Sequence, residues 1–346
     1  MISKIDKIIQ AIEKGHIPHR EYLRVRRLAY THASLATPGT VIFIVGPSRV
    51  GKSRICKALK TELERGSPNS GIPVIRAEAV IVGNARSIMK HLMLRLLKDI
   101  KHPLYLDPYS MEASPESYRP RLGSTESILR TTLESAIEYR RTRWILIDEA
   151  HHLVRTHSDA LAKNNLDSLK SLGNEHNVVL IIVGGYELLQ RGFLSSHLNG
   201  RVRFIHFPRY GDSQKDTEVW VSALGGLSKH LPFRKGASLL NLSEYLNDGT
   251  VGSFGAVVTW TFAALAEMEA RGGRFLRHTD YENTRLGIQR DSNREETEMG
   301  EELAKNLLRQ SASGSDETCC DKTEQQGQRT NGTPFRRKLG RDPVGC

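Results

Sequence analysis

Cysteine is scarce in this sequence, and its placement argues against two common uses of the residue. The four cysteines are Cys56, Cys319, Cys320 and Cys346, and no pair has the C-x-x-C spacing typical of a metal site. A chain of 346 residues with so few cysteines has no disulfide framework. We therefore expect a reducing compartment and a cytoplasmic location.

Long apolar runs are also absent. No stretch of about 18 apolar residues occurs, so we expect no membrane-spanning helix. The first residues, MISKIDKIIQAIEKGH, contain no uninterrupted apolar core, so we expect no signal peptide. Hydrophobic residues make up 38% and charged residues 26% of the chain, which is typical of a soluble globular protein.

Basic residues are in excess. Fifty Lys and Arg outweigh 39 Asp and Glu, which gives a formal net charge of +11. Such an excess favours a polyanionic partner, with nucleic acid first and an anionic membrane second. The alternative is a basic protein without such a partner, because net charge bears on association and not on fold.

Hydrophobic patterning predicts an α/β protein with a mostly parallel sheet. Short buried strands are expected at residues 40–45, 73–79, 144–147 and 178–183. Helices alternate with them, at residues 51–65, 85–100, 127–139 (capped by Ser124) and 161–173. The expected domains are an N-terminal helical segment (1–35), an α/β core (36–211), a helical lid (212–290) and a disordered tail with one short helix at 295–308 (291–346).

The segment GPSRVGKS, Gly46–Ser53, matches the phosphate-binding pattern G-x-x-x-x-G-K-[ST] at every fixed position. It lies between a predicted strand and a predicted helix, which is the context that such a loop requires. The two glycines allow the backbone N–H groups to surround phosphates, and the helix presents its positive end to the anion. Lys52 is expected to bind the β- and γ-phosphates, and Ser53 to be a Mg²⁺ ligand. The expected nucleotide-binding residues are Gly46, Pro47, Ser48, Arg49, Val50, Gly51, Lys52, Ser53 and Arg54.

Two acids follow the strand at 144–147. Asp148, at the carboxyl end of the strand, is expected to hold Mg²⁺ and so to complete the nucleotide site with Ser53. Glu149 is expected to act as the general base that activates water. His151 and His152 come next, but adjacent residues on a helix point about 100° apart, so we interpret both as structural.

Two later segments bear on hydrolysis. The strand at 178–183 ends at Gly184–Gly185–Tyr186, where ATPases of the AAA+ type place a polar residue that senses the γ-phosphate. Glycines leave that role unfilled or pass it to a neighbour. Arg201 and Arg203 follow the last expected core strand, where a trans-acting arginine finger is usual in ring-forming ATPases.

The order of these features resembles the TniB/TnsC family of AAA+ ATPases that regulate transposition. The resemblance runs from about residue 15 to 280 and rests on the P-loop, the DEAHHL segment, the Gly-Gly turn, the paired arginines and the glycine-punctuated segment 249–273. It implies an AAA+ P-loop fold that binds ATP and Mg²⁺ and forms homo-oligomeric rings or helical filaments around duplex DNA. It also implies that the protein links a target-selection protein to the transposase and is released from DNA on hydrolysis.

The resemblance assigns nucleotide and Mg²⁺ binding to Gly51, Lys52 and Ser53, metal binding and hydrolysis to Asp148 and Glu149, and the trans role to Arg201 or Arg203. The sequence departs from the family in two places. The sensor position is glycine, and no lid arginine is evident near Ser253–Phe254. Both departures concern the hydrolysis rate and not nucleotide binding.

Other functions fit the sequence less well. The string DEAH suggests a helicase, but such helicases need two RecA-like lobes, and only about 60 residues of helical pattern follow the core. A secretion-linked ATPase usually has a membrane segment, and a replication initiator a winged-helix domain, and neither pattern is present. A nucleotide-binding scaffold without catalysis has no need of Glu149.

Two surfaces are expected to bind partners. Candidate DNA contacts lie in a proline-rich insertion and before the acidic strand, at Lys101, Arg119, Arg121, Arg140 and Arg141. The basic segment Phe335–Gly345 is a candidate docking peptide for a transposition partner, or else an unstructured solubilising tail.

The P-loop assignment predicts that Lys52→Ala abolishes ATP binding, because N–H dipoles alone do not neutralise a triphosphate. Isothermal titration calorimetry of the wild type and the variant measures this directly. Equal ATP affinities in the two proteins would refute the assignment.

Overall fold

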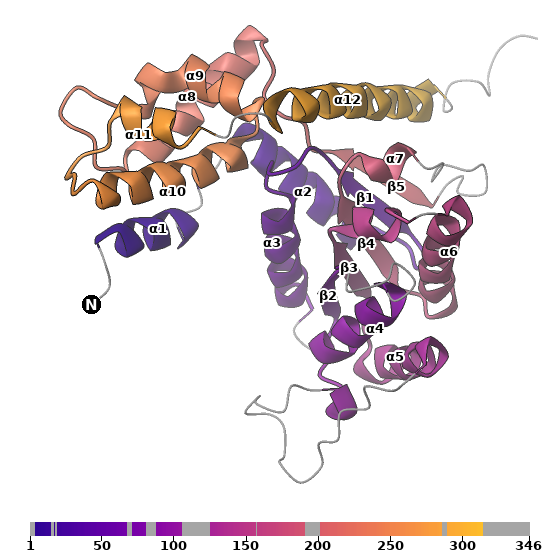
Figure 1. Cartoon of the computed structure of the whole chain (residues 1–346). Coiled ribbons are helices and arrows are strands. Elements are labelled where there is room, and N and C mark those ends of the chain that lie inside the picture. Colours follow the sequence, from indigo (N-terminus) through magenta and orange to yellow (C-terminus); the bar gives the residue numbers. More distant parts are fainter. Residues whose placement is uncertain are drawn as a thin grey trace, which may run out of the picture. The chain divides into compact units, whose positions relative to one another are not determined.

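The computed structural model describes residues 4–14, 17, 19–67, 71–80, 88–105, 125–156, 158–190, 201–285 and 289–313. Five parallel strands form one sheet in the order β2-β3-β4-β1-β5 (Figure 1). Their bounds are β1 Val41–Val45, β2 Val74–Glu78, β3 Trp144–Asp148, β4 Val179–Gly184 and β5 Val202–His206. The first four confirm the strands predicted from apolar runs.

The register of the strands decides which loops meet. Val45 at the end of β1 is level with Gly184 of β4 on one side and His206 of β5 on the other. Since all strands are parallel, the segments that follow β1, β3 and β4 emerge at one edge of the sheet, where ligands bind in open α/β sheets.

Helices cover both faces of the sheet. Buried side chains of α4 (Ile88–Asp99), α5 (Glu126–Arg140) and α6 (Asp159–Glu175) pack on one face. Side chains of α2 (Arg20–Ser34) and α3 (Lys52–Arg65) pack on the other. The two layers explain why β1, β3 and β4 are buried along their whole length and are apolar apart from Asp148 at the end of β3.

A separate apolar cluster forms the lid. Its helices are α8 (Gln214–Ser228), η5 (Leu239–Leu242), α9 (Ser243–Thr250), α10 (Phe254–Ala270) and α11 (His278–Asn283). Among the described residues no single helix is long and apolar enough to cross a membrane. Only the pair Leu239–Thr250 and Phe254–Ala270, bent by 112°, meets both criteria together.

The N-terminal segment, expected to be helical over residues 1–35, contains two helices that pack in different clusters. Helix α1 (Lys4–Lys14) buries Ile5 and Ile12 in the lid cluster, whereas α2 packs on the sheet. His19 lies between the two helices, and its Nδ1 is 2.6 Å from the Tyr210 hydroxyl in the segment that leads to the lid.

The prediction of a disordered tail from residue 291 is wrong for its first part. Helix α12 extends over Gln289–Ser313, well beyond the short helix expected at 295–308. It packs against the core, since Gly300 abuts Tyr186, Ala304 is fully buried and Glu301 pairs with Arg209 at 3.3 Å. The polar composition of this segment concealed the small residues that make its contact face.

Strand β5 was missed, because this edge strand is only partly buried and the residues around it are basic. The N-cap of α5 is Thr125 and not Ser124, since the Thr125 hydroxyl accepts a hydrogen bond from the Ile128 N–H at 3.4 Å. The proposed docking peptide Phe335–Gly345 lies outside the described residues.

The packing of α12 predicts that Gly300→Leu destabilises the protein. A Cβ at Gly300 would lie 2.2 Å from Tyr186 Cδ2, and Tyr186 is fixed by a 2.9 Å hydrogen bond to His206 Nε2. Overpacking of this kind costs about 1–3 kcal/mol. Denaturant unfolding measures the effect.

Met299→Ala is the matched control for Gly300→Leu, because the Met299 side chain on the same helix is 55% exposed. Leucine also has a higher helix propensity than glycine by roughly 0.5–1 kcal/mol. An increase in the stability of Gly300→Leu would therefore mean that α12 does not pack on Tyr186.

Candidate phosphate-binding site

The P-loop adopts a strained curl at the carboxyl end of β1. Gly51 has φ of 112°, and Arg49, which is not glycine, has φ of 58°. Gly46 serves a different purpose from the one expected, since its φ is not positive. A Cβ at Gly46 would lie 2.2 Å from the Phe207 carbonyl oxygen, so glycine is needed for the close approach of the segment after β5.

Lys52 opens α3 and is only 8% exposed. Its Nζ donates hydrogen bonds to the carbonyl oxygens of Gly46 at 2.9 Å and Pro47 at 2.6 Å. Burial lowers the pKa of Lys52 to about 8, although Glu149, Glu187 and Asp148 oppose the shift. A buried ammonium that bonds only neutral carbonyls favours an anion in the loop, and the residues fit a triphosphate.

Asp148 joins the P-loop to the sheet at the end of β3. The Ser53 hydroxyl donates to Asp148 Oδ1 at 3.3 Å, and Arg76 of β2 pairs with Oδ2 at 2.6 Å. Arg76 is in turn fixed by Cys56, since its Nε donates to Cys56 Sγ at 3.3 Å. The Ser53 and Asp148 oxygens are the hard donors that Mg²⁺ prefers, and they lie close enough together to hold it, so both predicted metal ligands fit the ion.

Glu149 follows Asp148 in a left-handed conformation, with φ of 51° and ψ of 33°. Its N–H donates to Asp148 Oδ1 at 3.0 Å, which holds the turn. The Glu149 side chain is half-buried, and burial raises the pKa of its carboxyl. A carboxylate with a raised pKa beside the P-loop suits a general base.

His151, for which a structural role is expected, lies beside the predicted base. Its Nδ1 lies 3.2 Å from Glu149 Oε2. Burial lowers the pKa of His151 to about 4, so the imidazole is neutral at pH 7. The short helix η3 (Ala150–Leu153) turns this ring back toward the base, and residue spacing alone did not reveal the turn. The His152 ring lies beside it, tilted by 45°, with ring centroids 4.2 Å apart.

The sensor position is filled by glycine for a steric reason. A Cβ at Gly184 would lie 2.7 Å from Leu188 Cδ1 and 3.0 Å from the His151 backbone N. The Leu188 side chain and the η3 backbone therefore take the space that a polar sensor side chain needs. A Cβ at Gly185 would lie 2.1 Å from the Glu187 carboxylate, which pairs with Arg155. A larger residue at Gly185 would therefore displace this carboxylate.

The lid contacts the P-loop through the first turn of α10. A Cβ at Gly255 would lie 2.1 Å from the Arg49 carbonyl oxygen, so the helix backbone rests on the loop backbone. No arginine occurs in the sequence between Gly249 and Ala270, in agreement with the missing lid arginine.

Arg201 and Arg203 lie away from this site in the same chain. Arg201 directly precedes β5, and Arg203 is level with Ile42, whereas the P-loop follows Val45. Since a strand rises about 3.3 Å per residue, Arg203 starts roughly 13 Å from Gly46 along the sheet. Both residues are exposed, and the Arg201 guanidinium donates to Asn174 Oδ1 at 3.4 Å.

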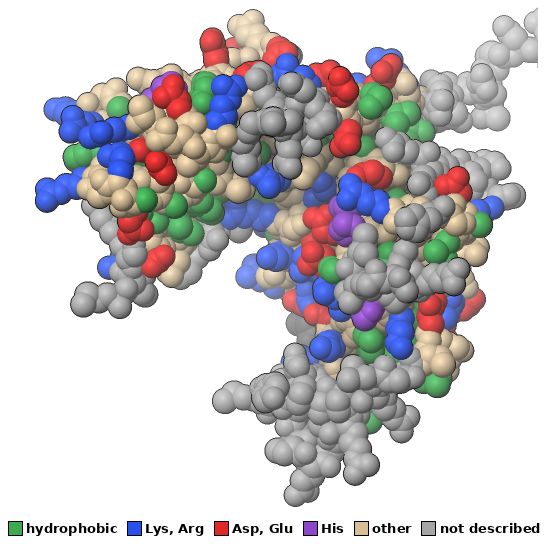
Figure 2. All heavy atoms as spheres, in the orientation of Figure 1, with side chains coloured by type: hydrophobic (Ala, Val, Ile, Leu, Met, Phe, Trp, Pro, Cys, Tyr) green, Lys and Arg blue, Asp and Glu red, His purple; other side chains and the backbone are tan. Residues whose placement is uncertain are grey.

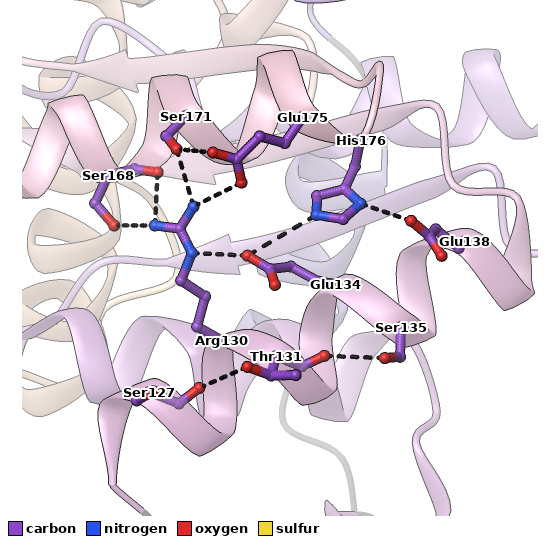
Figure 3. A network of polar contacts seen from close by, with 10 residues as sticks. All are labelled: Ser127, Arg130, Thr131, Glu134, Ser135, Glu138, Ser168, Ser171, Glu175 and His176. Atoms are coloured by element: carbon purple, nitrogen blue, oxygen red, sulfur yellow. Dashed lines mark hydrogen bonds and ion pairs between the residues drawn. The ribbon is translucent and has the colours of Figure 1, made fainter.

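A second polar cluster links α5 to α6, and its contacts favour a structural role over a metal site. Glu134, Glu175 and His176 bring three potential metal ligands within 4.8 Å of one another. Figure 3 shows the Arg130 guanidinium between the two carboxylates, with bonds of 2.7 Å to Glu134 and 3.3 Å to Glu175. Arg130 already supplies the positive charge, so the cluster acts as a clamp between two helices.

Comparison with known families agrees with this geometry. A family model described as AAA domain matches residues 36–191. A search of curated protein sequences gave no match. The domain match, the sheet order and the assembled P-loop identify an AAA+ P-loop ATPase fold, which confirms the predicted fold class and the predicted ATPase.

Solved structures show the same fold at low sequence identity. The ORC2 protein of Aeropyrum pernix in ADPNP–ADP complexes has a TM-score of 0.51 at 15% identity, over 76% of this chain and 66% of that one. The ORC1 protein of Aeropyrum pernix in complex with DNA has 0.53 at 14%, over 80% and 68%. Cdc6p from Pyrobaculum aerophilum has 0.50 at 13%, over 82% and 72%. The chain thus spans about two thirds of the length of these proteins.

The position of Glu149 predicts that Glu149→Gln retains ATP binding and loses turnover, because the amide keeps the shape and removes the base. Loss of a general base lowers the rate roughly 10²–10⁴-fold. Phosphate release and nucleotide titration measure the two effects separately. Glu187→Gln is the matched control, since Glu187 is a nearby carboxylate already paired with Arg155. Loss of turnover only in Glu187→Gln would assign the base to Glu187.

Proposed function

We propose that this AAA+ ATPase is an ATP-dependent DNA-binding regulator of DNA transposition. In this proposal it assembles on target duplex DNA with ATP bound and couples a target-selection protein to the transposase. Hydrolysis releases it from DNA. The proposal follows the resemblance of residues 15–280 to the TniB/TnsC family and the chemistry of the site.

The observation that carries the assembly step is the position of the two exposed arginines. Arg201 and Arg203 lie at the end of β5 that is remote from the P-loop of the same chain. An arginine finger at this place acts on the nucleotide of a neighbouring subunit. ATP would then lie between subunits, and its hydrolysis would weaken the assembly.

The residues of one chain supply the rest of the reaction. Lys52 neutralises charge on the transferred phosphate, and Ser53 and Asp148 would hold Mg²⁺, which supplies further positive charge to the phosphates when bound. Glu149 accepts the proton of the attacking water. Neutral His151, with Nδ1 3.2 Å from Glu149 Oε2, lies beside the carboxylate and leaves its charge in place.

Described basic residues support DNA binding at the outer end of α4 and α5. Arg140 Nη2 donates to the Lys101 carbonyl oxygen at 3.4 Å, and Arg141 is exposed beside it. Tyr139 is 81% exposed, with the Arg140 guanidinium 5.5 Å from its ring centroid. Arg119 and Arg121, the other expected contacts, lie outside the described residues.

Initiation of DNA replication is the alternative function. The solved ORC1 structure of the same fold is a complex with DNA. An initiator of that kind would bind defined sequences through a further DNA-reading domain. In the described residues after the lid, only α12 follows. Sequence preference therefore separates the two functions.

The proposed function predicts that duplex DNA binding requires ATP and depends little on sequence. One subunit offers few phosphate contacts, and assembly multiplies them, so affinity should fall steeply with salt. Fluorescence anisotropy on two unrelated duplexes, with and without a non-hydrolysable ATP analogue, at two salt concentrations tests this. Tight binding to only one duplex would favour the initiator, and binding that ignores nucleotide would contradict the assembly step.

A further inference from the structure

The lid carries a concentration of positive charge at the end of α10. The segments 229–236 (KHLPFRKG) and 271–278 (RGGRFLRH) contain six Lys and Arg and no acidic residue. The two segments are joined, because the Leu276 N–H donates to the Pro232 carbonyl oxygen at 2.9 Å. Figure 2 shows Lys and Arg side chains gathered at this end of the lid, at the left of the view.

These segments form a hollow and not a flat patch. It has a volume of about 580 Å³ and is lined by Gly272, Gly273, Phe275 and the four arginines Arg234, Arg271, Arg274 and Arg277. In this basic pocket, hydrogen bonds hold the Arg271 side chain in place. Asp280, fully buried, pairs with Arg271 through two bonds of 2.6 and 2.8 Å, and Arg271 Nη2 also donates to the Phe275 carbonyl oxygen at 2.7 Å.

The other three guanidinium groups remain available to a ligand. Within the part of the chain that the structure describes, Arg234, Arg274 and Arg277 make no ion pair with an acidic side chain. Arg234 lies over Phe275, 5.8 Å from its ring centroid, and Phe275 is 41% exposed. Three unpaired arginines beside an exposed ring favour a polyanion, because guanidinium groups match phosphate geometry.

We infer that the basic pocket of the lid binds backbone phosphates of duplex DNA, as a contact separate from the surface at Lys101, Arg140 and Arg141. This inference rests on the proposed function. It is supported by the polar lining, which suits phosphates better than an apolar peptide, and by the absence of acidic side chains in both segments. Since phosphates carry the contact, it adds affinity and no sequence preference.

The double variant R274A/R277A tests the inference in the full chain with an ATP analogue and a fluorescent duplex. We expect about tenfold weaker DNA binding or more, and a slope of log affinity against log salt that is smaller by about two. Unfolding and ATP affinity should match the wild type, because both side chains are exposed and alanine keeps the Arg277 N–H that donates to Asp280.

R27A/R65A is the charge-matched control, because both arginines are exposed on α2 and α3. Its DNA affinity should stay close to that of the wild type. Equal losses in the two double variants would mean that only total charge matters, and would overturn the inference. Wild-type affinity in R274A/R277A would also overturn it while the proposed function stands.

Two further results separate the remaining possibilities. If the wild type binds no duplex in any nucleotide state, the proposed function and the pocket inference both fail. If R274A/R277A loses binding to poly-L-glutamate but keeps DNA affinity, the pocket is a site for acidic polypeptides and the DNA inference is overturned. R274K/R277K should retain most of the DNA affinity, since lysine also binds phosphate as a point charge.

Discussion

The Lys52 ammonium is buried among carbonyl oxygens at the end of β1, and much of the site is arranged around it. Its hydrogen bonds go to neutral carbonyl oxygens, and burial lowers its pKa although three carboxylates farther away oppose the shift. The loop that surrounds it keeps two left-handed residues, Arg49 and Gly51. Such a conformation in a non-glycine residue costs of order 1 kcal/mol or more and persists only where the surroundings enforce it. Here the surroundings are Phe207 on one side and the lid helix α10 on the other.

Asp148 is a second buried charge at this site, and it too depends on partners that the fold holds in place. The carboxylate is almost completely buried, and Arg76 and Ser53 use one oxygen each. Removing one partner from a buried ion pair typically costs about 3–5 kcal/mol, because a buried charge is left uncompensated. Arg76 therefore stabilises the edge of the sheet at which the ligand groups meet, although nothing in the spacing of β2 identified it as part of the site.

Sequence patterns predicted the parts of the fold that depend on strong local signals. Continuous apolar runs located β1, β3 and β4, and the fixed spacing of the P-loop located Lys52 and Ser53. Features that depend on distant contacts were not predicted. Strand β5 has a half-exposed face, α12 presents Gly300 and Ala304 from a polar segment, and α1 is separated from α2 although they are neighbours in sequence. The position of His151 depends on the turn at Glu149, whose left-handed backbone has no signature in the sequence.

Helix α10 has its two ends in different chemical surroundings. Its first turn rests on the P-loop backbone at Gly255, and the segment that follows its last turn carries Arg271, Arg274 and Arg277. A helix of 17 residues is about 25 Å long. For a body of this length, a tilt of about 10° about the first turn corresponds to a shift of roughly 4 Å at the far end. Because α10 packs in one cluster with the other lid helices, a displacement of the phosphate loop at Gly255 would reach these arginines through the lid as a whole.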